Sequence, residues 1–174
     1  TIIPRGRALG LTQLLPIEDR HSYSKTHLLG QIAMIMGGRA AEQLVFSQLT
    51  TGASDDLKRA TELAKKMVCE WGMSERLGPI AYAGDGSQVF LGRDLMRHKT
   101  HSDETSRMID LEIKQILIKC YQRAEQTLIT YREALELIAK KLVEQETLEG
   151  EEVSRILGQF IPMPQLIPMP QPSS

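Results

Sequence analysis

The 174-residue sequence predicts a mainly α-helical domain, with a small β-hairpin or edge strand near its N-terminus and a long helical hairpin in its C-terminal half. Apolar residues recur every three or four positions over several long stretches, which is the spacing of an amphipathic helix. Two short runs near the N-terminus favour strands. The composition, 41% hydrophobic and 25% charged, is typical of a globular chain that can bury one core.

The predicted β element occupies the N-terminus. Residues 1–4 and 9–14 are short β-leaning runs separated by residues 5–7, and Pro16 interrupts the chain after them. We expect a small hairpin or a pair of edge strands.

The first helix is expected to begin after Ser24, a good N-cap, and to run to about Val45. Its apolar positions keep helical spacing on both sides of Gly37 and Gly38. The pattern therefore predicts one helix with a weakened middle, where paired glycines indicate either close approach of another backbone or a bend.

The clearest helix prediction begins at Ser54 and ends at Gly72. Its apolar stripe consists of Leu57, Ala60, Ala64, Met67, Val68 and Trp71. Residues 78–93 are predicted to form a turn-rich surface loop with a short strand-like run at 88–91.

The C-terminal half predicts three further helices. Ser102 caps a long one whose apolar seam, from Ile109 to Leu128, is most simply core. A second helix over 133–144 follows almost directly, so the two form an antiparallel hairpin or one kinked rod. A short helix over 151–157 precedes a Pro-rich five-residue repeat. We therefore divide the chain into a domain at 1–158 and an extended tail at 159–174.

Charge and hydropathy exclude several classes of partner. The net charge of −1, with mixed signs along the chain, provides no basic surface for nucleic acid or an anionic membrane. No apolar stretch approaches the ~18 to 20 residues that span a bilayer, and the N-terminus lacks the pattern of a signal peptide. We expect a soluble chain without direct membrane contact. Cys69 and Cys120 lie in helical patterns and are expected to be buried thiols from a reducing compartment.

Residues 50–57 carry the most distinctive pattern for chemistry. Ser54 is a candidate cap, and Asp55 and Asp56 lie in the first turn of the predicted helix. Capping alone explains this pattern, although two carboxylates also suit a cation. None of the four histidines begins a His-Glu-x-x-His motif. His98 and His101 have metal-compatible spacing, but they occupy a polar stretch, and we expect them to be exposed to solvent.

Six runs occur in an order that resembles the protease domain of the FtsH-type ATP-dependent zinc metalloproteases. They are TIIPRGRALG (1–10), GGRAAE (37–42), TGASDDL (51–57), WGMS (71–74), LGP (77–79) and VFLGR (89–93). A single run is a weak signal, whereas the ordered set is specific. The resemblance covers residues 1 to about 158.

The resemblance implies a zinc site. In that family two histidines of a His-Glu-x-x-His helix bind zinc, the intervening Glu is the general base, and an aspartate that matches Asp56 is the third ligand. The catalytic helix shortly precedes the strand that matches residues 1–4, so the chain is expected to begin just after it and to be inactive alone. Glu42 is expected to orient a ligating histidine; a simple helix-surface role is the alternative.

The resemblance also implies partners. Ile2, Ile3 and Pro4 match an edge strand that holds extended substrate by backbone pairing, although such a strand can also merely close the fold. Unfolded or membrane proteins are the expected substrates, and the parent is expected to be a membrane-anchored homo-hexamer. This domain would lie on the cytoplasmic side or in an organelle equivalent. No phosphate loop for ATP occurs here, so ATP is expected to bind a separate ATPase domain.

Two other interpretations of the chain's function remain open. The isolated chain is either an inactive part of a peptidase or a non-catalytic helical module for oligomerisation or interaction. A degenerate relative that never had the catalytic helix is the third possibility.

Overall fold

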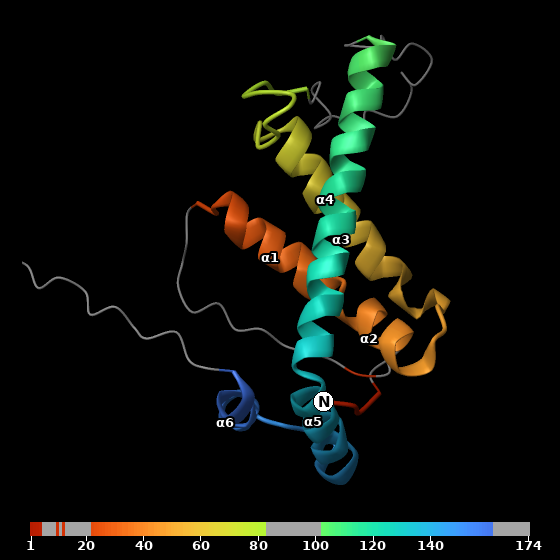
Figure 1. The fold of residues 1–174 in the computed structure, drawn as a ribbon, viewed down its shortest axis with the longest axis vertical. Coiled ribbons are helices and arrows are strands. Elements are labelled where there is room, and N and C mark those ends of the chain that lie inside the picture. The colour runs from red at the N-terminus through yellow and green to blue at the C-terminus, as the bar shows by residue number, and fades with distance from the viewer. Residues whose placement is uncertain (5–9, 11, 13–21, 83–101, 162–174) are drawn as a thin grey trace, which may run out of the picture. The chain divides into compact units, whose positions relative to one another are not determined.

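The structure, a computed structural model, describes residues 1–4, 10, 12, 22–82 and 102–161. Two compact units are present: a central unit of residues 20–128, and a terminal unit that combines residues 1–19 with residues 129–174. Every regular element in the described residues is a helix (Figure 1), which confirms the mainly α-helical fold. Within the described part of the chain, no helix has both the length and the apolar character needed to cross a membrane.

In the central unit, the predicted single helix is two helices. Helix α1 spans Lys25–Ile35 and α2 spans Gly37–Phe46, with Met36 between them. Ser24 caps α1 as predicted, since its hydroxyl accepts the N–H of His27 at 3.2 Å. A Cβ built on Gly37 or Gly38 meets no described atom within 4 Å. These glycines therefore mark a bend, and not the close approach of another described segment.

Helix α3 (Ser54–Cys69) follows a short 3-10 helix, η1 (Thr51–Ala53). Most of the predicted apolar stripe is confirmed, because Ala60, Ala64 and Met67 are fully buried. The prediction is wrong for its last member, Trp71, which lies beyond the end of α3 and is 44% exposed. The helix ends close to the predicted Gly72, which has a φ of 58°. A Cβ on Gly72 would lie 3.0 Å from the Cα of Pro79, so both its backbone angle and its surroundings require glycine.

Helix α4 (Asp103–Thr130) begins as predicted after Ser102, whose hydroxyl accepts the N–H of Thr105 at 3.2 Å. Its buried residues, Ile109, Cys120 and Ala124, belong to the predicted seam. Only Tyr131 separates α4 from the next helix in the sequence. The strand-like run at 88–91 lies outside the described residues.

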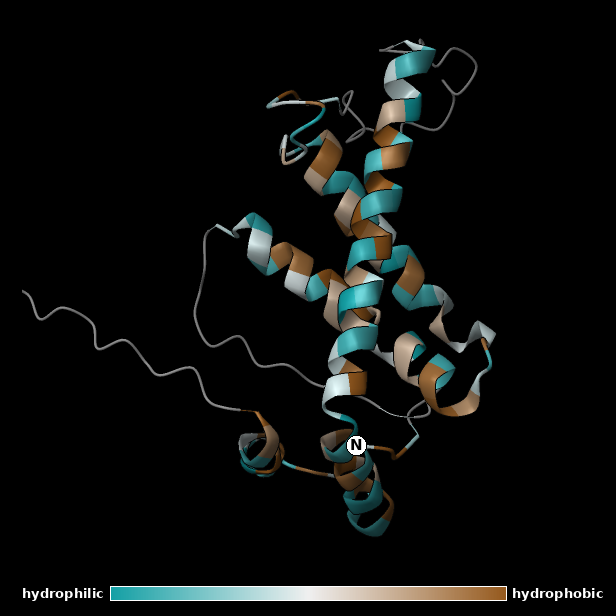
Figure 2. Ribbon diagram, viewed as in Figure 1, coloured by the Kyte–Doolittle hydropathy of each residue, from teal (hydrophilic) through white to brown (hydrophobic). Residues whose placement is uncertain are grey.

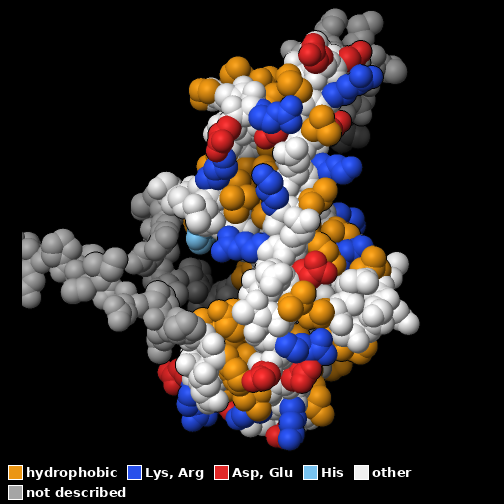
Figure 3. Space-filling model, in the orientation of Figure 1, with side chains coloured by type: hydrophobic (Ala, Val, Ile, Leu, Met, Phe, Trp, Pro, Cys, Tyr) orange, Lys and Arg blue, Asp and Glu red, His pale blue; other side chains and the backbone are white. Residues whose placement is uncertain are grey.

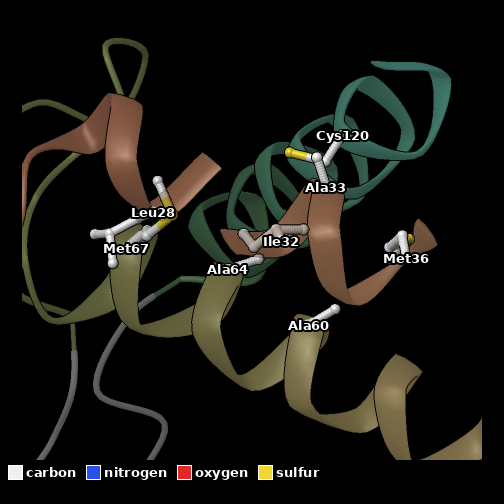
Figure 4. Packing of buried hydrophobic residues seen from close by; sticks show 8 residues of the cluster. All are labelled: Leu28, Ile32, Ala33, Met36, Ala60, Ala64, Met67 and Cys120. Atoms are coloured by element: carbon white, nitrogen blue, oxygen red, sulfur yellow. The ribbon is translucent and has the colours of Figure 1, made fainter. Parts of the chain in front are cut away.

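The core of the central unit joins α1, α3 and α4. Figure 4 shows Ile32 of α1 beside Ala64 of α3, with Cys120 of α4 nearby. Ala60 and Ala64 of α3 are small, so α1 can approach α3 closely at these positions. Figure 2 shows the same helices with alternating apolar and polar stretches, as amphipathic helices require.

The terminal unit contains α5 (Arg132–Gln145) and α6 (Gly150–Phe160). Ala134 and Ile156 are buried, and Lys141 Nζ lies 2.6 Å from Glu152 Oε1. The hydrogen bond from Lys141 lowers the pKa of Glu152. Helix α6 runs to Phe160, beyond the predicted end at 157. The Pro-rich repeat, from residue 162 on, lies outside the described residues, and the division at 158 stays a prediction.

The predicted strand at residues 1–4 is wrong, because these residues form no strand. The N–H of Ile2 donates to the carbonyl of Glu146 at 2.9 Å, and the hydroxyl of Thr1 donates to the same carbonyl at 3.1 Å. Glu146 follows the last residue of α5 with a φ of 60°. The β-leaning run therefore meets the end of a helix instead of a strand. Most of the second run, 9–14, is not described.

Candidate metal-ligand site

Asp56 lies in the first turn of α3, where its side chain is 46% exposed. Its Oδ1 is 3.8 Å from Nη1 of Arg59, a distance too long for a hydrogen bond. The neighbouring Asp55 instead pairs at 3.1 Å with Lys58. Asp56 thus keeps an accessible carboxylate beside a positively charged helix end.

Glu42 of α2 holds the segment that leads to Asp56. Its Oε2 accepts the backbone N–H of Thr50 at 3.3 Å, and its Oε1 accepts the hydroxyl of Thr50 at 2.7 Å. The oxygen of that hydroxyl in turn accepts the N–H of Gly52 at 3.2 Å. A chain of hydrogen bonds therefore connects α2 to η1, directly before the turn of α3 that carries Asp56. The predicted action of Glu42 on a histidine stays a prediction.

Thr50 is the functional residue that sequence reasoning missed. Its side chain caps η1, whereas Ser54, the predicted cap, is the first residue of α3 and makes no side-chain cap hydrogen bond. The interpretation of Ser54 as the cap is therefore wrong. Thr50 is itself a good N-cap type directly before the Thr-Gly-Ala run, which was the available signal.

Among the described residues, the remaining candidates contribute no further ligand to Asp56. His27 stacks on Tyr23 with ring centroids 5.1 Å apart, while the other three histidines lie outside the described residues. Among the described side chains, no three of His, Cys, Asp or Glu come together in a way that would hold a metal ion. Ile2 and Ile3 are about two-fifths exposed, in the terminal unit; their role with substrate stays a prediction.

The cysteines are buried and free, as predicted. Burial raises the pKa of the Cys69 thiol, and it also raises the pKa of the Cys120 thiol. Both thiols are therefore protonated at neutral pH, which makes them poor metal ligands and poor nucleophiles.

A comparison with protein families gives one decisive match. The family model described as Peptidase family M41 matches residues 1–156. The chain belongs to peptidase family M41. This membership confirms the resemblance drawn from the six sequence runs, and residue 156 agrees closely with the expected end of that resemblance.

This M41 chain is similar to several proteins named FtsH. It is 52% identical over 158 residues to the "ATP-dependent zinc metalloprotease FtsH" of Magnetococcus marinus, an alignment covering 91% of this chain and 24% of the relative. It is 46% identical over 172 residues to "ATP-dependent zinc metalloprotease FtsH 3" of Symbiobacterium thermophilum, an alignment covering 99% of this chain and 27% of that relative. It is 48% identical to the "ATP-dependent zinc metalloprotease FtsH" of Myxococcus xanthus, and that alignment covers 90% of this chain and 25% of the relative. The chain spans about a quarter of the length of these relatives.

Replacing Thr50 with valine tests the hydrogen-bond chain. We expect the amide of Gly52 to exchange with solvent markedly faster, and the free energy of unfolding to fall by about 1 kcal/mol, the usual effect of losing a capping hydroxyl. Hydrogen exchange followed by NMR measures the first effect and urea unfolding the second. Thr51→Val is the matched control, because the same hydroxyl is lost one residue later. Equal exchange rates in both variants would rule out the role assigned to Thr50.

Proposed function

We propose that this M41 chain is part of the proteolytic domain of an ATP-dependent zinc metalloendopeptidase. The relatives that it matches over most of its own length carry that activity in their names. The observation that supports the proposal in the structure is the accessible carboxylate of Asp56 in the first turn of α3. Hydrogen bonds between Glu42 and Thr50 tie the segment before that turn to α2.

Asp56 is the residue of this chain that would hold zinc. A carboxylate oxygen is a normal zinc ligand, and the side chain of Asp56 is exposed enough for a zinc ion to reach it. Zinc, when bound, would polarise a peptide carbonyl and activate water. The chain's own contribution is to fix the direction of the carboxylate through η1 and the first turn of α3. Two histidines and a general-base Glu would come from a helix before Thr1.

The proposal extends to the whole protein. ATP would bind a separate ATPase domain, and the subunits would form a homo-hexamer. The protein would degrade unfolded and membrane proteins, with Ile2, Ile3 and Pro4 near the path of an extended substrate. The parent would be anchored in a membrane, with this domain on the cytoplasmic side or in an organelle equivalent.

A second candidate function is a non-catalytic module for oligomerisation or interaction. Its support is a group of exposed apolar side chains at the end of α2 and in the residues after it. Phe46 is 68% exposed, Leu49 55% and Val45 43%. Such a patch is typical of an interaction surface. The two candidates differ in one requirement: a zinc-dependent peptidase needs the carboxylate of Asp56 for its function, whereas an interaction module does not.

Zinc stoichiometry separates the two candidates. We expect the 174-residue chain to bind no stoichiometric zinc and to leave unfolded casein intact, because one carboxylate is not a metal site. A longer form with a His-Glu-x-x-His helix before Thr1 should bind one zinc per chain and cleave casein. Elemental analysis and gel electrophoresis provide the two readouts. Tightly held zinc with chelator-sensitive cleavage in the short chain would contradict the proposal, as would a zinc-free long form.

A further inference from the structure

A cleft in the central unit lies between the start of α1, the segment after α3 and the middle of α4. Its volume is about 330 Å³, enough for a small ligand or part of a peptide. Asp56 lies at the opposite end of α3, a helix of 16 residues that is roughly 24 Å long at ~1.5 Å per residue. The cleft is therefore a separate feature of the chain.

The cleft is basic although the chain as a whole is slightly acidic. Four basic and two acidic side chains line it, which gives a formal charge of +2, whereas the chain carries −1. Figure 3 shows Lys and Arg side chains along α4 and the elements next to it, interspersed with apolar ones. A concave basic surface with low-dielectric walls concentrates anions.

Each of the two acidic side chains pairs with one of the four basic side chains. Glu112 accepts a hydrogen bond from Ser74 at 2.7 Å and lies 3.5 Å from Arg76. Glu75 pairs with Lys25 at 3.2 Å, but the Glu75 side chain is 93% exposed. Water screens that second pair strongly, so Lys25 can turn towards a ligand at little cost.

Lys119 and Arg123 have no ion pair with any described residue, although both line the cleft. They are four residues apart on α4 and therefore point from the same face of the helix. Two like charges in this arrangement repel each other, and a bound anion would remove the repulsion. Arg123 can also bind a carboxylate through two parallel N–H groups.

Apolar side chains complete the lining. Leu29, Met73 and Ile116 contribute from the three surrounding segments. A bare inorganic anion would leave these groups in contact with water, whereas an organic acid would cover them. We infer that this cleft binds a peptide carboxylate flanked by an apolar side chain, with Lys119 and Arg123 as the anion partners. The inference does not depend on zinc or on the proposed peptidase activity.

The test is NMR titration of the metal-free, ¹⁵N-labelled 174-residue chain. Acetyl-Ala-Leu with a free terminal carboxylate, and acetyl-Asp-Leu-amide with a side-chain carboxylate, are the two acidic probes. We expect at least one to shift the amide signals of residues 73–76 and 116–123, which also identifies the preferred carboxylate. Acetyl-Ala-Leu-amide and inorganic phosphate should produce much smaller shifts.

Variants assign the binding to the basic pair. The double variant Lys119→Ala/Arg123→Ala should bind the acidic probe about tenfold more weakly, as expected when charge-assisted hydrogen bonds are lost. Lys65→Ala/Lys66→Ala, with the same loss of charge on exposed sites of α3, should bind normally. Absence of shifts with both acids, equal shifts with the amide or phosphate, or unchanged binding by the first variant would each overturn the inference.

Discussion

Replacing Ile32 with alanine should destabilise the chain by about 2–5 kcal/mol, the usual range for a large core residue truncated to alanine. The side chain of Ile32 is fully buried, and it packs in the cluster that joins α1, α3 and α4. Its removal leaves a cavity, because Ala60 and Ala64 are too small to fill the space. Urea unfolding followed by circular dichroism measures the free energy.

Met34→Ala is the control for this substitution. Met34 lies two residues away on the same helix, but its side chain is 51% exposed. Its truncation should change the free energy of unfolding by less than about 0.5 kcal/mol. Similar losses in both variants would mean that α1 does not pack on α3 through Ile32.

The second large effect is expected from Asp56→Ala in the longer form that contains the His-Glu-x-x-His helix. Zinc affinity should fall by more than about 100-fold, since even residues that only orient a metal ligand contribute about 10–100-fold. Casein cleavage should be lost at the same time. Competition with a chromogenic zinc chelator measures the affinity.

Asp55→Ala is a matched control, because the same carboxylate is removed one residue earlier in the same helical turn. Asp55 pairs with Lys58 and is exposed, so its loss should leave both zinc binding and cleavage nearly unchanged. If Asp55→Ala abolished zinc binding and Asp56→Ala did not, the ligand would have been assigned to the wrong carboxylate.

Sequence patterns predicted the helices that depend on their own periodicity. The stripe from Ala60 to Val68 is buried on one face of α3, and Ser102 caps α4 as its residue type indicated. The break at Met36 was not predicted as the end of a helix. The apolar spacing continues across Gly37 and Gly38, so periodicity alone cannot distinguish a bend within one helix from two helices.

The prediction of an N-terminal strand was wrong for a different reason. Residues 1–4 favour a strand by type, but the partner of the Ile2 N–H is the carbonyl of Glu146, far away in the sequence. Local propensity contains no information about such a contact. Tertiary hydrogen bonding therefore decided the conformation of these residues.

The candidate site was only partly predictable. Asp56 was identified through the ordered family runs, because two acids at a helix start are explained equally well by capping. The link from Glu42 to Thr50 joins residues eight apart across a helix end and a turn. Thr50 and Ser54 are both good caps, and only the folded chain distinguishes them.

The most direct test of the zinc assignment is a crystal structure of the longer form, with anomalous diffraction data collected at the zinc edge. We predict one anomalous peak about 2.0–2.2 Å from a carboxylate oxygen of Asp56, which is the normal zinc–carboxylate distance. A fully occupied zinc bound by other side chains, with the Asp56 carboxylate turned away into solvent, would contradict the account.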